Sequence, residues 1–171
     1  MTDPLTGVAN RALLLDRLAH ALARLDRTGE RAAVLYVDLD GFKSVNDRFG
    51  HRVGDEVLRS TASRLQGCLR SADTLARMGG DEFVVLCEDL PSPEPVSDIA
   101  GRLVAAVAHP LQVGGCVVTL SARVGVAASP PPPPADLLHQ ADAAMYRAKR
   151  RAPRVAVAEP VAGRGVIDLR D

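Results

Sequence analysis

The stretch Ala32-Ala33-Val34-Leu35-Tyr36-Val37 is a continuous apolar run that ends abruptly in Asp38-Leu39-Asp40-Gly41. A strand without polar alternation is expected where both faces of a sheet are covered. Two further apolar segments, residues 74–78 and 83–86, flank Gly79-Gly80, and glycine accepts the positive φ values of tight turns. The sequence therefore predicts a sheet covered on both faces that contains a β-hairpin. Carboxylates lie where its buried strands end.

Segments with helical spacing surround these strands. Residues 10–25 carry leucines at steps of three or four, and residues 53–69 show the same spacing. We expect further helices at residues 99–108 and 135–150, and a turn at Gly114-Gly115 that leads into a strand at residues 117–127. Because helices and strands alternate, the predicted fold class is α/β or α+β around one covered sheet.

The length and the linkers suggest one domain. A chain of 171 residues can form one core without disulfides or a structural metal. Five prolines at residues 130–134 predict a stiff extended connector, although a proline-ligand role stays open. Residues 152–171 have weak strand character near 155–158, followed by Gly and Pro. We predict a domain over residues 1–152, and a terminal strand and tail over 153–171 that lead toward a neighbouring domain.

The composition excludes several classes of function. Basic and acidic residues balance at 21 each, and with two Tyr, three Phe and no Trp there is no stacking platform for a nucleic-acid polymer. No stretch has the ~18 consecutive apolar residues of a membrane span, and the polar start is not a signal peptide. We expect a cytoplasmic domain, which is compatible with sensor or membrane segments elsewhere in a longer protein. Three scattered cysteines are interpreted as reduced packing thiols.

Carboxylates follow both buried strands: Asp38 and Asp40 after the first, Asp81 and Glu82 at the hairpin. If these strands are neighbours, the like charges repel, and a hard divalent cation with oxygen ligands compensates them. Mg²⁺ commonly completes its shell with water and substrate phosphates, so metal and nucleotide are predicted together. The alternative is that both clusters are ordinary turn residues.

Several motifs resemble one family at the family's spacing. Arg77-Met78-Gly79-Gly80-Asp81-Glu82-Phe83 carries the signature of the GGDEF domain, the catalytic module of diguanylate cyclases. The opening motif (3–11), the blocks at 37–43 and 46–58, and the last helix (141–149) are also similar to family blocks. The resemblance implies a central, mostly antiparallel five-stranded sheet flanked by helices, similar to the adenylyl cyclase catalytic and polymerase palm folds.

The resemblance also implies site residues. A Mg²⁺ or Mn²⁺ ion would be held by the strand-end carboxylates and one backbone carbonyl, with Glu82 either holding a second metal or helping to deprotonate the attacking 3′-hydroxyl. A carboxylate and an amide would read the guanine edge, because guanine presents N1 and N2 donors. Exposed amides and lysines would hold the triphosphate. The implied residues are Asp81 and Glu82 for catalysis; Asp38, Leu39, Asp81 and Glu82 for metal; Asn46 and Asp55 for guanine; Gly41, Phe42, Lys43 and Lys149 for phosphate; and Gly79 and Gly80 for the signature turn.

Arg70 and Asp73 resemble the family's inhibitory RxxD site, where cyclic di-GMP binds away from the active site; the alternative is a surface ion pair. Two positions depart from the family pattern. Pro153 stands where a phosphate-binding arginine is expected, so the phosphate clamp is in question. Arg123 stands where a small residue, often serine, is usual, and the sequence assigns it no contact.

The predicted function is a metal-dependent diguanylate cyclase that condenses two GTP into cyclic di-GMP and two pyrophosphates, with product inhibition at the RxxD site. Each site would bind one GTP, so two sites would face each other in a transient homodimer. The opening motif begins at Asp3, and we expect an untethered, mainly monomeric chain. One alternative is a catalytically weak domain that senses GTP or cyclic di-GMP within a larger, phosphodiesterase-containing protein. Another is a cyclase or polymerase relative with a different nucleotide.

Overall fold

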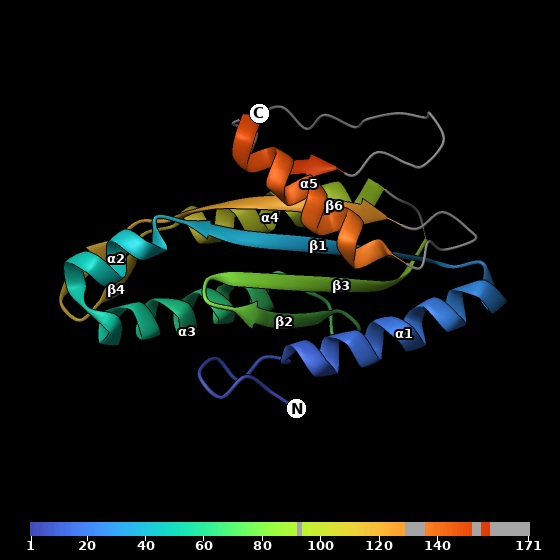
Figure 1. The fold of residues 1–171 in the computed structure, drawn as a ribbon, viewed down its shortest axis with the longest axis horizontal. Helices are drawn as coiled ribbons and strands as arrows, with labels where there is room; N and C mark the ends of the chain where they lie inside the picture. The colour runs from blue at the N-terminus through green and yellow to red at the C-terminus, as the bar shows by residue number, and fades with distance from the viewer. Residues whose placement is uncertain (92–93, 129–135, 152–154, 158–171) are drawn as a thin grey trace.

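The fold is built around one five-stranded sheet, shown in Figure 1 by a computed structural model that describes residues 1–91, 94–128, 136–151 and 155–157. The strand order is β2-β3-β1-β6-β7. The strands of this sheet are β1 (Arg31–Asp40), β2 (Thr74–Gly79), β3 (Glu82–Leu90), β6 (Ser121–Ala128) and β7 (Val155–Val157).

Antiparallel pairing dominates this sheet. β1 pairs antiparallel with β3 and β6, β2 pairs antiparallel with β3, and β7 runs parallel to β6. β1 is central and its residues 32–39 are all buried, as expected of a strand covered on both faces. The mostly antiparallel five-stranded sheet predicted from the sequence is confirmed.

Helices cover both faces of the sheet. α1 (Arg11–Thr28) and α5 (Leu137–Arg151) pack on one face, against alternate residues such as Val34 and Val84. α3 (His51–Gly67) and α4 (Glu94–Ala108) pack on the other face, against Leu35 and Val85. The separation of these helices into two layers is visible in Figure 1. Within the described part of the chain, no helix is long and apolar enough to cross a membrane.

The sequence prediction missed one helix and merged two strands into one. α2 (Phe42–Phe49) was not predicted as a helix, because only Phe42 and Val45 of its eight residues are buried. The strand predicted at residues 117–127 is two strands: β5 (Cys116–Val118) pairs with β4 (Leu111–Val113) in a separate hairpin, and β6 begins at Ser121. Gly114 and Gly115 both have positive φ, so they reverse the chain as predicted, but into this small hairpin.

The remaining boundaries differ modestly from the prediction. α4 begins at Glu94 rather than near 99, and a proline is tolerated in the first turn of a helix. The predicted connector at 130–134, most of the C-terminal tail and Pro153 lie outside the described residues.

α5 approaches β6 closely, since a Cβ on Gly125 would overlap backbone atoms of Ala141 and Met145.

Candidate functional site

Two carboxylates face each other where β1 ends beside the β2–β3 turn. Asp38 on β1 is the register partner of Glu82 on β3, and register partners in an antiparallel pair point to the same face. Asp38 is only 4% exposed. Next to it, the amide of Leu39 donates to the carbonyl of Asp81 at 3.3 Å. The structure thus brings together the four residues predicted for the metal, as two facing side chains and one backbone hydrogen bond.

Tyr36 contacts this carboxylate pair from the same strand. Its hydroxyl donates to Oε2 of Glu82 at 3.1 Å. Burial, and then the negative charge of Glu82 and its hydrogen bond, raise the pKa of Tyr36, so the hydroxyl keeps its proton and remains a donor. Tyr36 therefore provides one hydrogen bond that orients the Glu82 carboxylate. The sequence identified Tyr36 only as part of an apolar strand, because its partner is 46 residues away.

The signature turn has the geometry predicted for it. Gly79 and Gly80 have φ values of 148° and 51°, which favour glycine. Arg77 donates from Nε and Nη2 to the Gly80 carbonyl at 3.0 and 2.8 Å, and its Nη1 lies 3.3 Å from both oxygens of Asp3. The opening motif is therefore tied to the turn that carries Asp81 and Glu82. Sequence reasoning recognised both motifs but not this contact.

The predicted guanine-binding residues lie on neighbouring helices. Asn46 is on α2 and Asp55 is on α3, and the two helices pack against each other. The Asn46 amide lies against Gly54, since a Cβ at Gly54 would overlap Oδ1 of Asn46. A glycine next to Asp55 thus makes room for the Asn46 side chain. The structure therefore places the Asn46 side chain against the residue that precedes Asp55.

The predicted phosphate-binding stretch directly follows Asp40. Gly41 has a φ of 87° and precedes the first turn of α2, where helix amides have no intrahelical partner. Phe42 is buried, and Lys43 is exposed. Lys149 lies in the last turn of α5, but its side chain is outside the described part of the structure.

Arg123 also lies at this end of the sheet. Its Nη1 is 2.6 Å from Oδ1 of Asp40, and the hydroxyl of Ser121 donates to Oδ2 of Asp40 at 3.5 Å. Arg123 is the register partner of Asp38 on the side of β1 opposite Glu82. Arg123 was recognised from the sequence as a departure from the family pattern, but its contact with Asp40 was not predicted.

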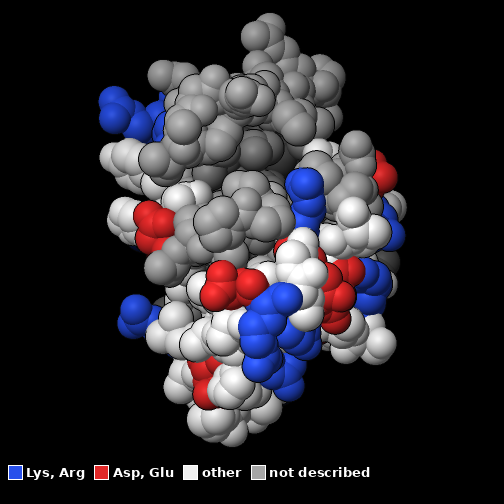
Figure 2. Space-filling model, turned by 90° about the vertical axis from the view of Figure 1, so that its right-hand side faces the viewer, with Lys and Arg blue, Asp and Glu red and all other residues white. Residues whose placement is uncertain are grey.

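The residues predicted for the inhibitory site form a pair at the other end of the sheet. Nε and Nη2 of Arg70 lie 3.3 and 2.8 Å from the two oxygens of Asp73, and Nη2 also donates to the Glu88 carbonyl. The hydrogen bond to Asp73, partly opposed by burial, raises the pKa of Arg70. The Asp73 side chain is 1% exposed, whereas that of Arg70 is 46% exposed. Acidic and basic side chains are interspersed on the face seen from this end (Figure 2).

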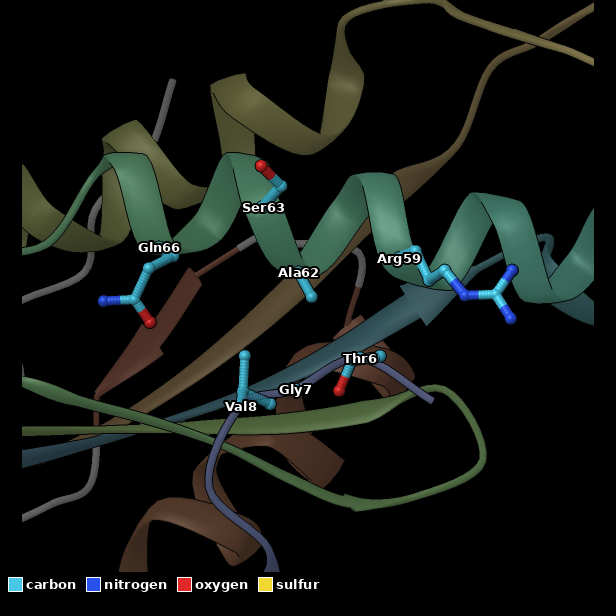
Figure 3. A pocket seen from close by; sticks show the side chains of 7 residues that line it. All are labelled: Thr6, Gly7, Val8, Arg59, Ala62, Ser63 and Gln66. Atoms are coloured by element: carbon cyan, nitrogen blue, oxygen red, sulfur yellow. The ribbon is translucent and has the colours of Figure 1, made fainter. Parts of the chain in front are cut away.

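A separate cavity of about 380 Å³ lies between the opening motif and α3 (Figure 3). None of the catalytic, metal, guanine, phosphate or inhibitory-site residues predicted from the sequence lines it. Its lining consists of Thr6, Gly7, Val8, Arg59, Ala62, Ser63 and Gln66. The carboxylate pair is on the opposite face of the sheet, together with Tyr36 and the α1 and α5 layer.

Among the described side chains, no three His, Cys, Asp or Glu groups are gathered as a ready metal site. Two facing carboxylates, one of them buried, nevertheless match the oxygen ligands of a hard divalent cation. Mg²⁺ is usually bound by one or two carboxylates, with water and substrate phosphates as the remaining ligands. The described residues therefore fit Mg²⁺ that binds together with a nucleotide.

Comparisons with known proteins identify relatives of this chain. Residues 1–154 match the family model for the diguanylate cyclase GGDEF domain. Diguanylate cyclase TpbB from Pseudomonas aeruginosa is 44% identical over 153 residues, which are 88% of this chain and 35% of TpbB. The chain thus spans about a third of the length of this curated relative.

Solved structures show the same fold. The GGDEF domain of TpbB (also called YfiN) from Pseudomonas aeruginosa superimposes with a TM-score of 0.88 at 43% identity, over 93% of this chain and 95% of that one. The coiled coil and GGDEF domain of DgcB from Caulobacter crescentus, in complex with cyclic di-GMP, gives a TM-score of 0.83 at 28% identity, over 92% of this chain and 85% of that one. The chain belongs to the GGDEF domain family of diguanylate cyclases, as its motifs predicted.

Proposed function

We propose that this domain condenses two GTP molecules into cyclic di-GMP and two pyrophosphates at the end of the sheet that carries the signature turn. The observation that carries the proposal is the pairing of Asp38 with Glu82 beside the Gly79-Gly80 turn. Family membership supports the reaction class. GTP is a cytoplasmic nucleotide, which supports a cytoplasmic location.

In the proposed reaction, the 3′-hydroxyl of one GTP attacks the α-phosphorus of the other. A P–O bond forms, the bond to the pyrophosphate oxygen breaks, and the hydroxyl loses its proton. Asn46 and Asp55 orient the guanine, while Lys43, Lys149 and the backbone of residues 41–43 hold the phosphates. Asp38, Asp81 and the Leu39 carbonyl would hold a Mg²⁺ or Mn²⁺ ion, which would supply positive charge to stabilise the transferring phosphate. Glu82 either holds a second cation or accepts the proton, and its hydrogen bond from Tyr36 keeps it oriented in both roles.

Incubation with GTP and Mg²⁺, followed by chromatography of the products, tests this proposal. We expect cyclic di-GMP and pyrophosphate from GTP and no cyclic dinucleotide from ATP. Asp81→Ala should abolish the product with little change in melting temperature, because the backbone hydrogen bond to Leu39 is retained. Asp26→Ala, which removes an exposed carboxylate on α1, is the matched control. Product formation at the parent rate by the Asp81 variant would refute the catalytic assignment.

We also propose that cyclic di-GMP inhibits the domain at Arg70 and Asp73. The half-exposed guanidinium of Arg70 suits a phosphate and a guanine face, and Asp73 holds it in place. Arg70→Ala should weaken cyclic di-GMP binding by about 2 kcal/mol or more, on the scale of a charged hydrogen bond. Calorimetry measures this affinity, with Arg27→Ala, a substitution on α1, as the control. Unchanged affinity would place the ligand elsewhere.

The alternative function, a sensor of GTP or cyclic di-GMP without useful turnover, makes the opposite prediction for the chromatography. Such a sensor would bind the nucleotide in calorimetry and yield no product. Pro153, at the position where the family has a phosphate-binding arginine, is the sequence feature that favours this alternative.

A further inference from the structure

Arg123 shares one face of the sheet with the two carboxylates of the candidate site. In register, Glu82, Asp38 and Arg123 form a row across β3, β1 and β6. Side chains directly opposite each other on one face have Cβ atoms about 4.5–5.5 Å apart. A fixed positive charge therefore lies beside the site where a triphosphate and a divalent cation are proposed to bind.

The Arg123 guanidinium is held by Asp40. The contact of 2.6 Å joins one guanidinium nitrogen to one oxygen of Asp40, and Ser121 donates to the other oxygen. A guanidinium has five N–H donors, so this contact leaves donors for another acceptor. The two side chains are 27% and 26% exposed, so the ion pair is accessible from solvent at the site.

Asp40 places this ion pair next to the predicted phosphate-binding stretch. Asp40 is the last residue of β1, and Gly41 and the first turn of α2 follow it directly. Arg binds phosphate through paired hydrogen bonds, which are stronger than those between neutral groups. A triphosphate carries more negative charge than one carboxylate, so it can share the guanidinium with Asp40.

We propose that Arg123 binds a phosphate of the GTP substrate, with Asp40 as the residue that positions its guanidinium. The proposal rests on the proposed function of the site. It gives this domain a phosphate-binding arginine on β6, from a position where the family usually has a small residue. Arg123 is then a determinant of affinity for the triphosphate and not for the guanosine part of the substrate.

The test compares the affinity of the domain for a ligand without phosphates and for a ligand with three phosphates. Guanosine and a GTP analogue with a methylene group between the α and β phosphorus atoms are titrated by competition with a fluorescent GTP derivative, in Mg²⁺. Arg123→Ser should weaken binding of the analogue roughly tenfold or more and leave guanosine affinity unchanged. The affinity of Arg123→Lys for the analogue should be intermediate, because lysine offers a point charge in place of the paired donors of the guanidinium. Arg27→Ser, on α1, is the control for loss of an exposed arginine.

The outcomes separate this proposal from the proposed function. Urea unfolding of Arg123→Ser measures how much the ion pair with Asp40 contributes to the free energy of unfolding. A loss of stability with unchanged affinity for the analogue, or an equal loss for guanosine and the analogue, overturns the phosphate role of Arg123. Normal cyclic di-GMP synthesis alongside either result leaves the proposed function intact. Failure of the parent chain to bind any guanine nucleotide rejects both.

Discussion

Asp3 is the residue at which the opening motif contacts the signature turn. The backbone amide and hydroxyl of Thr6 donate to Oδ1 of Asp3 at 2.8 and 2.7 Å. Arg77 bridges from the Asp3 carboxylate to the Gly80 carbonyl. Two loops far apart in sequence therefore share one arginine, which links the Asp3 carboxylate to the turn that carries Asp81.

We expect Asp3→Asn to make stability less dependent on pH. Burial alone would raise the pKa of Asp3, but hydrogen bonds from Thr6 and the charge of Arg77 outweigh it and lower that pKa below its ordinary value. A depressed folded-state pKa contributes stability above the unfolded pKa, and this contribution is lost as pH falls through the folded pKa. Asp3→Asn should therefore cost about 1–2 kcal/mol of unfolding free energy at neutral pH.

Urea unfolding at about pH 6 and about pH 3 checks this expectation, with the difference between variant and parent as the measured quantity. The difference should shrink at the lower pH, because the parent then loses the charge that the variant lacks. Asp26→Asn, at an exposed site on α1, is the control and should show no such change. If Asp3→Asn lowered the unfolding free energy by the same amount at both pH values, the charge effect assigned to Asp3 would be contradicted.

At the scale of elements, the close contact between α5 and β6 depends on one missing side chain. A Cβ on Gly125 would overlap the Met145 amide and the Ala141 carbonyl, which are backbone atoms and cannot rotate away. We expect Gly125→Ala to push α5 off the sheet and to lower the unfolding free energy by about 1–3 kcal/mol, the usual cost of overpacking. Because Lys149 lies in α5, GTP turnover should fall as well.

Gly101→Ala is the matched control for Gly125→Ala. Gly101 lies in α4, and a Cβ there meets nothing within 4 Å. That substitution should stabilise the helix by about 0.5–1 kcal/mol. Denaturant unfolding of both variants, with GTP turnover, checks the pair. Equal stability of the Gly125 variant and the parent would show that α5 can shift without cost.

The extent to which the sequence predicted these elements follows from how each one is stabilised. β1 and the β2–β3 hairpin were predictable because long apolar runs and a Gly79-Gly80 turn are local signals. α2 buries only two residues, and β4 and β5 are three residues each, so their local patterns were too weak. The family motifs predicted the site residues. The contacts of Tyr36, Arg77 and Arg123 depend on strand register and loop position, which no local pattern contains.

At the scale of the whole molecule, the domain has one set of proposed catalytic residues, at one end of one sheet. The proposed product contains two nucleotides joined by two equivalent links, and the family resemblance gives one GTP to each site. Twofold symmetry of two facing domains satisfies both links, because each domain presents its 3′-hydroxyl to the partner's α-phosphorus. Within the described residues, the large apolar side chains exposed at the surface lie on different elements: Met1, Leu15, Val117 and Tyr146.

We therefore expect the specific activity of this chain to rise with enzyme concentration. In the described part of the chain only four large apolar side chains are exposed, which is few for the continuous patch of a stable dimer, so we expect facing pairs to form by diffusional encounter. Fusion of a parallel coiled coil before Asp3 should raise turnover at low enzyme concentration, because it increases the effective concentration of the second site. The same fusion with proline substitutions that break the coiled coil is its control. Flat specific activity over about a hundredfold dilution, with light scattering reporting monomer throughout, would rule out the facing-site mechanism.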